Sequence, residues 1–518
     1  MDSTNRLSRL PLLLGMLFCA AFSVVFIAKS TFVHEGETWF TLFDDAMISM
    51  RYAKNLVNGF GLVWNPGGLA VEGYTNFLWT LWMAILHVLP VAESKISLTV
   101  MLTSVILLGV ILFSVWRIHE KLRHPIAATA FSLACLATYY PLYFWSLRGM
   151  EVGALAALAS LSALQCLDIE ETCPPRSLWW VGIFSALGVL IRMDYLVLAI
   201  VFSAFAAYVA PAADRAKAAA TTVGPAILAL VALTIFRWGY YDDLLPNTYY
   251  LKMTGTPLAT RAAHGLLRLV DILCGSLLGV ALGWLVAIPA LLPKASVREK
   301  RFLGLLVAAI LSQLAYSVYV GGDAWEWAGF SNRYITVAAP FFFIIPAMAL
   351  SRSRLPVVAV LLLVAFQFAI GQWTFFNDWH ETGGTFVQED MDMTRMGLRL
   401  RRHTSAATTI AVTWAGAIPY FAERTAFDIL GKNDRTIART TPKGEFAPGH
   451  DKWESGYMFG LLKPDVAVQV WGADNKAMQR YGYFRTPEKL WVKTASATRL
   501  YATGGWKSPR LGLMDIEW

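Results

Sequence analysis

Charged residues are scarce in this chain of 518 residues. Asp, Glu, Lys and Arg together make up 15% of it, whereas hydrophobic residues make up 56% and the mean hydropathy is +0.49. A soluble globular protein carries about 25% charged residues, so this composition excludes that class and indicates an integral membrane protein. The net charge of +8 does not indicate a nucleic-acid partner, because basic residues of multispanning proteins collect in cytoplasmic loops.

Cysteines are few, and none of them forms a CxxC pair. The five are Cys19, Cys135, Cys166, Cys173 and Cys274. This pattern excludes a disulfide framework and a cysteine zinc site. The sequence also has no internal repeat of fixed period and no low-complexity tract. The N-terminal stretch RLSRLPLLLGMLFCAAFSVVFIAKS starts like a signal peptide but has no clear cleavage site, so we expect a retained first span.

Long apolar runs are what the sequence has in abundance. A helix needs about 20 apolar residues to cross a bilayer. On that measure eleven spans are predicted, at 11–29, 96–116, 125–147, 152–168, 177–192, 195–210, 219–237, 266–292, 302–320, 334–350 and 355–376. These crossings predict a cytoplasmic N-terminus and an external C-terminus.

One further apolar segment, 75–92, decides the orientation. If it crossed the membrane, the basic loops 117–124, 213–217 and 293–301 would all be exported, against the rule that Lys and Arg of short loops stay inside. We therefore predict that 75–92 is a half-inserted or surface-lying helix. Its Trp79 and Trp82 suit the headgroup level.

The predicted fold is an all-α multispanning domain followed by a small α/β domain. The first covers 1–376 and includes an external loop at 30–94; the second covers 377–518, where the composition becomes polar. TTIAVTWAGAIPYFAERTAFDIL predicts a strand, a helix and a strand, and KPDVAVQV predicts another short buried strand. We expect this second domain on the external side.

Six polar stretches fall together on the predicted outer side. Ionisable groups at membrane depth cost about 2.5–3.5 kcal/mol each on insertion scales and usually pair, face a cavity or mark a functional site. The candidate binding residues in them are Arg51, Tyr52, Glu72, Tyr74, Asn76, Arg148, Glu151, Arg192, Asp194, Asp243, Asn247, Tyr250, Lys252, Asp323 and Arg333. The alternative is structural pairing of Arg148 with Glu151, Arg192 with Asp194, and Asp323 with Arg333.

The first loop contains two adjacent carboxylates, Asp44 and Asp45. Thr41 and Asp44 resemble a capping box, and Gly59 and Gly61 end the run, so a short helix is predicted. On that helix the two carboxylates lie about 100° apart, so one can face a reacting group while the other binds a cation or a backbone amide. Two like charges this close raise one pKa, which suits a general base. The alternative is that Asp44 only caps the helix.

The motifs together resemble a known family. DDAMISMRYAKNLVNGFGLVWNPGGLAVEGYTNFLWTLW, RGME, IRMD, YYDDLLPNTYYLK, VGGDAWEW with NRY, and AGAIPYFAERTAFDILG are similar to GT-C membrane glycosyltransferases related to the mycobacterial terminal arabinofuranosyltransferase. They are also similar to proteobacterial membrane proteins known through flagellar-motor control and virulence. Arg148 and Met193 depart from the family pattern, which leaves the donor sugar open.

The resemblance implies an activity and its partners. An acidic pair in the first external loop supplies the catalytic base, which places that role on Asp44 and Asp45. The donor is a polyprenyl phosphate carrying arabinofuranose or a similar sugar. The acceptor is a cell-envelope glycan or protein on the outer side of the bacterial inner membrane. Membrane lipid is a partner and nucleic acid is not.

The chemistry of such a transfer assigns further roles. The departing phosphate needs cations, for which we favour Arg333 and Lys252; Arg51 could also balance the acidic pair. Near the sugar or acceptor we expect Asp242, Asp243, Asn247, Tyr249 and Tyr250, although interfacial tyrosines are also membrane anchors. Glu72 could shape the first loop or contact sugar hydroxyls.

A metal, a histidine and two other functions stay open. Asp44, Asp45 and Asp323 could gather oxygen ligands for Mg²⁺, Mn²⁺ or Ca²⁺, though no spacing requires a metal. His450 could reach the acceptor or simply be solvated. A lipid-linked sugar transporter would show inverted repeats and charges near the midplane, which this sequence does not. A non-catalytic scaffold or motility regulator would depend on 377–518 rather than on the acidic pair.

Overall fold

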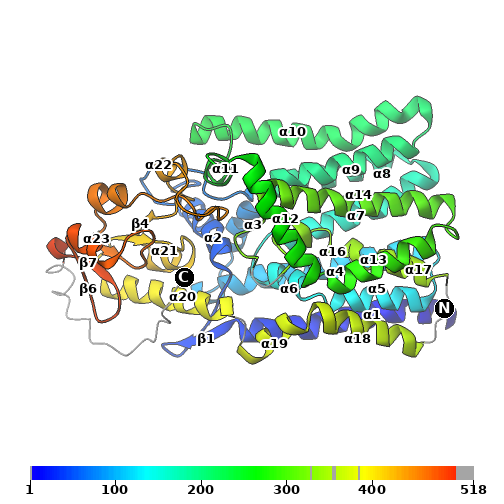
Figure 1. Ribbon diagram of the computed structural model, residues 1–518, viewed down its shortest axis with the longest axis horizontal. Coiled ribbons are helices and arrows are strands. Elements are labelled where there is room, and N and C mark those ends of the chain that lie inside the picture. Colours follow the sequence, from blue (N-terminus) through cyan, green and yellow to red (C-terminus); the bar gives the residue numbers. More distant parts are fainter. Residues whose placement is uncertain (1–2, 327–329, 353–356, 383–384, 497–518) are drawn as a thin grey trace.

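The computed structural model describes residues 3–326, 330–352, 357–382 and 385–496. Figure 1 shows an elongated molecule in which long helices lie side by side over most of the length, while the strands gather at the opposite end from the N-terminus. Parts of the predicted span 355–376, of the motif VGGDAWEW and of the domain 377–518 lie outside the described residues.

The helical part follows the apolar segments of the sequence. Its longer helices are α1 Ser3–Lys29, α4 Glu93–Lys121, α7 Val152–Thr172, α8 Pro175–Ile191, α9 Leu196–Val209, α10 Arg215–Tyr241, α12 Leu258–Cys274, α13 Leu278–Leu291, α14 Val297–Val320, α18 Val357–Gly371 and α20 Thr385–His403. Further helices are α2 Asp44–Val57, α3 Phe77–His87, α5 Ile126–Ala137, α6 Tyr140–Leu147, α11 Asn247–Met253, α15 Arg333–Thr336, α16 Ala339–Phe342, α17 Ile344–Leu350 and α19 Trp373–Thr382. Two 3₁₀ turns, Met193–Tyr195 and Ala212–Asp214, precede α9 and α10.

The structure supports a membrane protein with fewer full-length spans than predicted. Within the described ranges five helices are long and apolar enough to cross a bilayer, and up to seven if α5 with α6 and α12 with α13 each count as one bent span. Other predicted spans fall on shorter apolar helices, among them α8 with 17 residues. A helix of that length covers about 25 Å at 1.5 Å per residue, less than the hydrocarbon core of about 30 Å. The number eleven therefore stays a prediction.

Helix α3 lies in the segment that decides the predicted orientation. It has 11 residues, which is about 16 Å of helix and too short to cross a bilayer alone. Trp79 is buried and its indole Nε1 donates to the Gly149 carbonyl at 2.9 Å, whereas Trp82 is 37% exposed. The short length agrees with a segment that does not cross.

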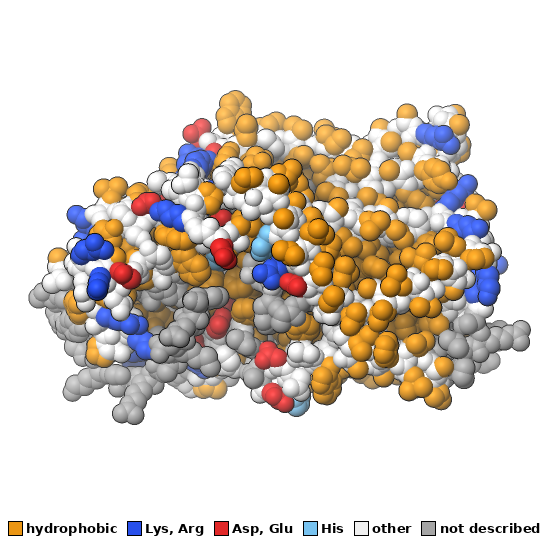
Figure 2. Space-filling model, viewed as in Figure 1, with side chains coloured by type: hydrophobic (Ala, Val, Ile, Leu, Met, Phe, Trp, Pro, Cys, Tyr) orange, Lys and Arg blue, Asp and Glu red, His pale blue; other side chains and the backbone are white. Residues whose placement is uncertain are grey.

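The basic loops predicted to be cytoplasmic meet at one end of the helical part. Lys121, the last residue of α4, pairs with Asp168 of α7, and Arg298 at the start of α14 pairs with Glu171 of α7 at 2.9 Å. In Figure 2, Lys and Arg side chains gather at that end, beyond a broad belt of hydrophobic side chains. This arrangement agrees with the predicted orientation, because the helix connections that share one end are the ones rich in Lys and Arg.

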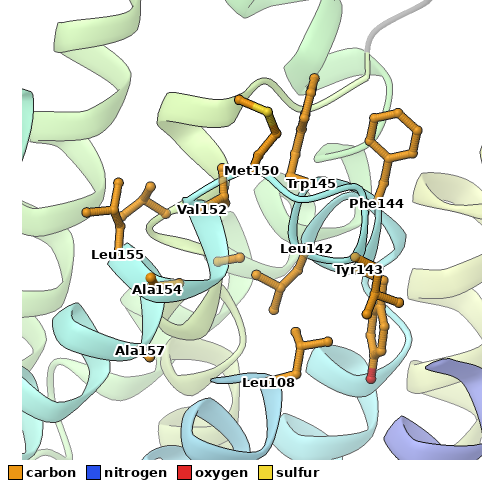
Figure 3. Close-up of a cluster of buried hydrophobic side chains, with 14 of the residues drawn as sticks. Leu108, Leu142, Tyr143, Phe144, Trp145, Met150, Val152, Ala154, Leu155 and Ala157 are labelled. Carbon is orange, nitrogen blue, oxygen red and sulfur yellow. The ribbon is translucent and has the colours of Figure 1, made fainter. Parts of the chain in front are cut away.

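A buried apolar cluster holds the turn that leads to the site. Leu108 of α4, Phe144 of α6, and Leu155 of α7 lie within it (Figure 3). Trp145 of α6 is completely buried, and its Nε1 donates to the Ser331 carbonyl at 2.8 Å. The cluster thereby fixes the short connection 148–151 between α6 and α7.

The first loop folds into a hairpin and a helix. Strands β1 Thr31–His34 and β2 Glu37–Phe40 pair antiparallel and lead into α2. The predicted capping box is wrong: Phe43 occupies the N-cap position without a side-chain cap, and the Thr41 hydroxyl donates to the Ser30 carbonyl instead. The predicted end is confirmed, because α2 stops at Val57 and the following Gly59 adopts φ +82°.

The C-terminal strands form one five-stranded sheet in the order β4-β3-β5-β7-β6. The strands are β3 Thr409–Val412, β4 Thr425–Asp428, β5 Val466–Ala467, β6 Tyr483–Arg485 and β7 Trp491–Lys493. The helices beside them are α21 Ala417–Ala422, α22 Arg435–Ala438 and α23 Asn475–Arg480, together with a π-helical turn at Gly456–Leu462. The predicted strand, helix and strand are present as β3, α21 and β4. The external location of this region stays a prediction.

The parallel pairing of β3 and β4 sets up the site. Thr409 aligns with Thr425 and Val412 aligns with Asp428, so both strands end at the same edge of the sheet. The loops that follow, 413–416 and 429–434, therefore lie at the same sheet edge. Both loops contact the first loop of the helical part through Gly416 and Asn433.

Candidate functional site

A cavity of about 320 Å³ lies between the helical part and the C-terminal sheet. Several residues predicted from the sequence line it: Asp45, Tyr74, Asn76, Glu151, Arg192, Asp194, Tyr249, Lys252 and Arg333. Ser49, Met150, Thr248, Tyr316, Tyr334, Lys432 and Pro448 also line it. The structure thus brings polar stretches from distant parts of the chain to one place.

Asp45 is the carboxylate that faces this cavity. Its Oδ1 accepts from Lys432 Nζ at 2.8 Å, and its Oδ2 accepts from Arg333 Nη1 at 2.9 Å and from Trp325 Nε1 at 3.3 Å. Burial alone would raise the pKa of Asp45, but Lys432, Arg333 and Lys252 outweigh it and hold the pKa well below its ordinary value. Asp45 is therefore ionised at neutral pH.

Arg333 holds the Asp45 carboxylate in its orientation. Its Nε and Nη2 each donate to Asp323 at 2.6 Å, and this bidentate pair leaves Nη1 for Asp45. The guanidinium also lies 5.6 Å from the centre of the Trp145 ring. The structure confirms the pairing of Asp323 with Arg333 that the sequence offered as an alternative.

Lys252 is a free cation on the cavity wall. It lies near the end of α11, and within the described parts of the chain it makes no hydrogen bond or ion pair. Burial and the neighbouring Arg333 lower the pKa of Lys252 to about 8, against the opposite effects of Asp323 and Asp45. A cation without a partner in a partly buried cavity favours the binding of an anion.

A second charged group forms another part of the wall. Arg192 Nη1 donates to Glu151 at 2.7 Å, and the same guanidinium pairs with Asp194 at 3.0 Å. Asn76 Nδ2 donates to the other oxygen of Glu151 at 2.9 Å. The Arg192–Asp194 pair is confirmed. This group offers carboxylate and amide groups of the kind that recognise hydroxyls.

The pairing of Arg148 with Glu151 is wrong. Arg148 is completely buried and pairs with Asp390 of α20, and it also donates to the Thr41 carbonyl at 3.1 Å. Arg148 therefore ties the first loop to the helix that leads into the C-terminal sheet. The sequence offered Glu151 as its partner because of proximity along the chain, whereas Asp390 lies 242 residues away.

Asp44 points away from the cavity and towards the C-terminal sheet. Its Oδ1 accepts from Ala417 N at 2.7 Å and from Gly416 N at 3.2 Å, at the start of α21. Burial raises the pKa of Asp44 to about 7, although the Ala417 amide and Lys432 oppose the shift. The two adjacent carboxylates thus face different partners: Asp44 binds backbone amides and Asp45 faces the cavity.

Other predicted residues join the first loop to its surroundings without lining the cavity. Arg51 Nη2 donates to Asn65 Oδ1 and to the Arg424 carbonyl, both at 2.9 Å. Tyr52 donates to the Val71 carbonyl at 2.7 Å, and Glu72 pairs with Arg237 of α10 at 2.6 Å. These contacts use up the polar groups of Arg51 and Tyr52.

The predicted residues of YYDDLLPNTYYLK divide between the cavity and the C-terminal loops. Asn247 Nδ2 donates to the carbonyls of Gly431 at 2.9 Å and Lys432 at 3.0 Å. Asp243 pairs with Arg439 at 2.7 Å, and the same guanidinium lies 4.1 Å from the centre of the Tyr250 ring. Asn247, Asp243 and Tyr250 hold the loop around Lys432, while Tyr249 and Lys252 line the cavity.

The sequence reasoning missed Lys432. It lies in GKND, a polar stretch directly after the predicted strand TAFDIL, and polar residues at the carboxyl end of a parallel strand mark binding sites. The sequence therefore contained a signal that could have found Lys432. It did not indicate that the sheet edge after TAFDIL would contact the first loop.

His450, which the sequence placed either near the acceptor or in solvent, lies in a buried aromatic environment. His450 is buried against the rings of Trp325, Trp414 and Trp471, and burial lowers its pKa to about 3, so it is neutral. In the described ranges no three His, Cys, Asp or Glu side chains are grouped so as to hold a metal ion. Binding of Mg²⁺, Mn²⁺ or Ca²⁺ stays a prediction.

Comparison with known proteins adds the fold and one domain. Residues 379–507 match the family model of a domain of unknown function, DUF8728. Curated protein sequences give no match. The chain is similar in fold to ArnT from Cupriavidus metallidurans in the apo state, with a TM-score of 0.53 and 12% identity over 87% of this chain and 91% of that one.

A second similar structure contains a lipid. ArnT from Cupriavidus metallidurans bound to undecaprenyl phosphate matches with a TM-score of 0.53 and 11% identity, over 80% of this chain and 85% of that one. At such identities the likeness shows the fold alone. The chain therefore has an ArnT-like fold, and membership of the GT-C superfamily and of the arabinofuranosyltransferase family both stay predictions.

Proposed function

We propose that this protein is a membrane glycosyltransferase that takes its sugar from a polyprenyl-phosphate donor. One observation carries the proposal: a cavity in an ArnT-like fold holds an ionised carboxylate, Asp45, beside Lys252, a cation that has no partner among the residues that the structure describes. ArnT has been solved with undecaprenyl phosphate bound, which supports a lipid of the same class here.

The proposed reaction uses a carboxylate and two cations of the cavity wall. An acceptor hydroxyl attacks the anomeric carbon of the donor sugar, and a new glycosidic bond forms as the bond from that carbon to the phosphate oxygen breaks. Asp45 takes the hydroxyl proton, and the polyprenyl phosphate leaves with the bonding electrons. Lys252 and Arg333 stabilise the negative charge that develops on the phosphate.

The remaining wall residues fit a sugar. Tyr74, Asn76 and the charged group formed by Glu151, Arg192 and Asp194 present hydrogen-bond donors and acceptors for hydroxyls. On the resemblance of the motifs, we propose arabinofuranose or a similar sugar as the transferred group. The acceptor is a cell-envelope glycan or protein on the outer side of the bacterial inner membrane.

The test starts with the lipid that the purified protein carries. Mass spectrometry of the protein in nanodiscs identifies any co-purified polyprenyl-phosphate sugar, and the identified donor then serves in a transfer assay. We expect Asp45→Asn to bind the donor but to lose transfer by about 10²- to 10⁴-fold, the usual contribution of a positioned base. Asp271→Asn is the matched control, because Asp271 is 50% exposed and pairs with Arg268 one helical turn away.

The outcomes separate the competing functions. Full transfer by the Asp45→Asn protein, or no binding of undecaprenyl phosphate by the unaltered protein, contradicts the proposal. Movement of labelled lipid across reconstituted vesicles without any product glycan would indicate a transporter. A motility phenotype that survives Asp45→Asn but not removal of the C-terminal sheet would indicate a scaffold.

A further inference from the structure

The C-terminal sheet contributes a charged residue to the cavity, and nothing in its match to a domain of unknown function assigns it a role. Lys432 lies in the loop after β4, is only 5% exposed, and directs its ammonium to Asp45. Contacts on both sides of the loop hold Lys432 in this position.

The loop that carries Lys432 is held from within by Asp428. The Asp428 carboxylate accepts from the backbone amides of Leu430 at 3.0 Å, Gly431 at 3.1 Å and Asn433 at 2.8 Å, so it closes a tight turn. Gly431 adopts φ +78°, a conformation that residues with a Cβ rarely adopt. The backbone around Lys432 is therefore fixed.

The same loop is held from outside by the helical part. Asn247 donates to the carbonyls of both Gly431 and Lys432, and the Tyr52 hydroxyl lies 3.0 Å from Asn433 Oδ1. A Cβ on Gly73 would lie 1.9 Å from Asn433 Oδ1, so the two loops touch with no spare room. With the backbone held on both sides, the Lys432 ammonium can change partners by rotation of its side chain alone.

The charges on this part of the wall do not balance. Lys252, Arg333 and Lys432 are cations, and the carboxylates of Asp45 and Asp323 pair with two of them. Asp44 and Asp428 also favour the charged form of Lys432, but both accept from backbone amides and burial raises the pKa of each. Arg333 is committed to its two carboxylate partners through its three donor nitrogens, and Lys252 has no partner in the described residues. An entering anion would thus bind Lys252 and compete with Asp45 for the ammonium of Lys432.

We infer that the C-terminal domain is part of the active site, where Lys432 binds Asp45 in the empty protein and passes to the donor phosphate when the lipid enters. The inference rests on the proposed function, which it deepens by assigning the phosphate a ligand from this domain. While Lys432 is bound to Asp45, the carboxylate is a poor proton acceptor. Transfer of Lys432 to the phosphate returns basicity to Asp45, so the base becomes active only when the donor is in place.

The experiment compares Lys432→Met and Lys432→Arg in the full-length protein. The control is Lys443→Met, because Lys443 lies in the same domain and pairs with Glu454 near the surface. Affinity is measured in nanodiscs for undecaprenyl phosphate and for undecaprenol, which lacks the anion. We expect Lys432→Met to weaken undecaprenyl phosphate binding about 10- to 100-fold, the loss expected for one charge-assisted hydrogen bond, and to leave undecaprenol binding unchanged.

A second readout separates this role from a structural one. Removal of a cation beside Asp45 raises its pKa, so the acidic limb of the pH profile of kcat/KM should move to higher pH in Lys432→Met. Lys432→Arg should restore donor affinity. Equal loss of affinity for both lipids, or an unchanged affinity for undecaprenyl phosphate with an unmoved acidic limb, would overturn the inference.

The two proposals fail in different ways. If the unaltered protein binds the donor and Asp45→Asn abolishes transfer while Lys432→Met behaves like Lys443→Met, the glycosyltransferase stands and only the role of Lys432 is refuted. If the unaltered protein neither binds undecaprenyl phosphate nor transfers sugar, both proposals are refuted. Melting curves of the variants in nanodiscs report whether the fold survives, and Lys432→Arg keeps the test valid if Lys432→Met unfolds.

Discussion

Adjacent residues on one helical turn can serve opposite purposes, and Asp44 and Asp45 do so here. Successive side chains on a helix point about 100° apart. Asp44 is buried against the amides of Gly416 and Ala417, whereas Asp45 lies among cations at the cavity. The chemical identity of the two carboxylates is the same, so their surroundings alone give them different pKa values.

The raised pKa of Asp44 predicts a dependence of stability on pH. With a pKa of about 7 in the folded protein and an ordinary value of 3.8, the folded state binds more protons than the unfolded state between about pH 4 and pH 7. Stability contributed by Asp44 therefore falls as the pH rises through this window. We expect Asp44→Asn to remove that part of the decline, as measured by melting curves in nanodiscs from pH 4.5 to pH 8.

The comparison variant for this prediction is Asp45→Asn. The pKa of Asp45 is depressed, so its contribution to stability is present at neutral pH and is lost only as the pH falls below its ordinary value. Asp45→Asn should thus lower stability at pH 7, in contrast to Asp44→Asn. Equal pH slopes for the unaltered protein and Asp44→Asn would contradict the assignment.

Arg333 offers a prediction about geometry rather than charge. Its planar guanidinium binds Asp323 with two nitrogens and Asp45 with the third, which a lysine ammonium cannot reproduce. We expect Arg333→Lys to lower transfer at least tenfold and to reduce the free energy of unfolding by about 1–3 kcal/mol. Arg268→Lys, in an exposed pair with Asp271, should change neither quantity, and transfer assays with denaturation curves check both.

At the scale of elements, the site depends on the contact between two loops and one helix. The loops after β3 and β4 share an edge because the strands are parallel, and they press on α2 and on the segment around Gly73. Gly416 approaches Asp44 so closely that a Cβ there would lie 1.8 Å from the Asp44 carbonyl oxygen. The two glycines are therefore required by close approach between elements, not by turn geometry.

A single methyl group should separate these elements. In Gly73→Ala the added Cβ would meet Asn433 Oδ1 at 1.9 Å and the Lys432 carbonyl at 3.0 Å, so the loop that carries Lys432 must shift. We expect weaker donor binding, measured by lipid titration. We also expect faster protease cleavage in the segment around Gly73 and in the loop 429–434, measured by limited proteolysis. Gly224→Ala in α10 is the control, because no atom lies within 4 Å of its added Cβ. Unchanged donor binding in Gly73→Ala would show that the loop contact is not needed.

At the scale of the molecule, charge and apolar surface indicate how it lies in a membrane. The loops rich in Lys and Arg meet at one end, and the C-terminal sheet lies towards the other (Figures 1 and 2). The cavity is lined in part by Lys432 and Pro448 of the C-terminal region. On the positive-inside rule, we expect the cavity on the external side. We expect alkaline phosphatase fused after the C-terminus to be active in cells, and a fluorescent protein fused within the loop 293–301 to be fluorescent. The reverse pattern would contradict the orientation and remove the external site.

Much of this molecule follows from the sequence because membrane physics acts on local composition. The membrane class, the positions of the apolar helices, the strand, helix and strand after residue 408, and the stretches that carry the site could all be predicted from hydropathy and motifs. The motif residues Asp45, Asn76, Glu151, Arg192, Lys252 and Arg333 indeed line one cavity. Each of these inferences needs only residues close together in the chain.

The tertiary structure decided what depends on residues far apart in the chain. Which of the two carboxylates faces the cavity is set by Gly416, 372 residues after Asp44, and the partner of Asp45 is Lys432, 387 residues later. The partner of Arg148 is Asp390, not nearby Glu151. Burial and pairing energies act between atoms in contact, so the sequence supplied the charged groups, and only the packing of the sheet edge on the first loop determined which of them meet.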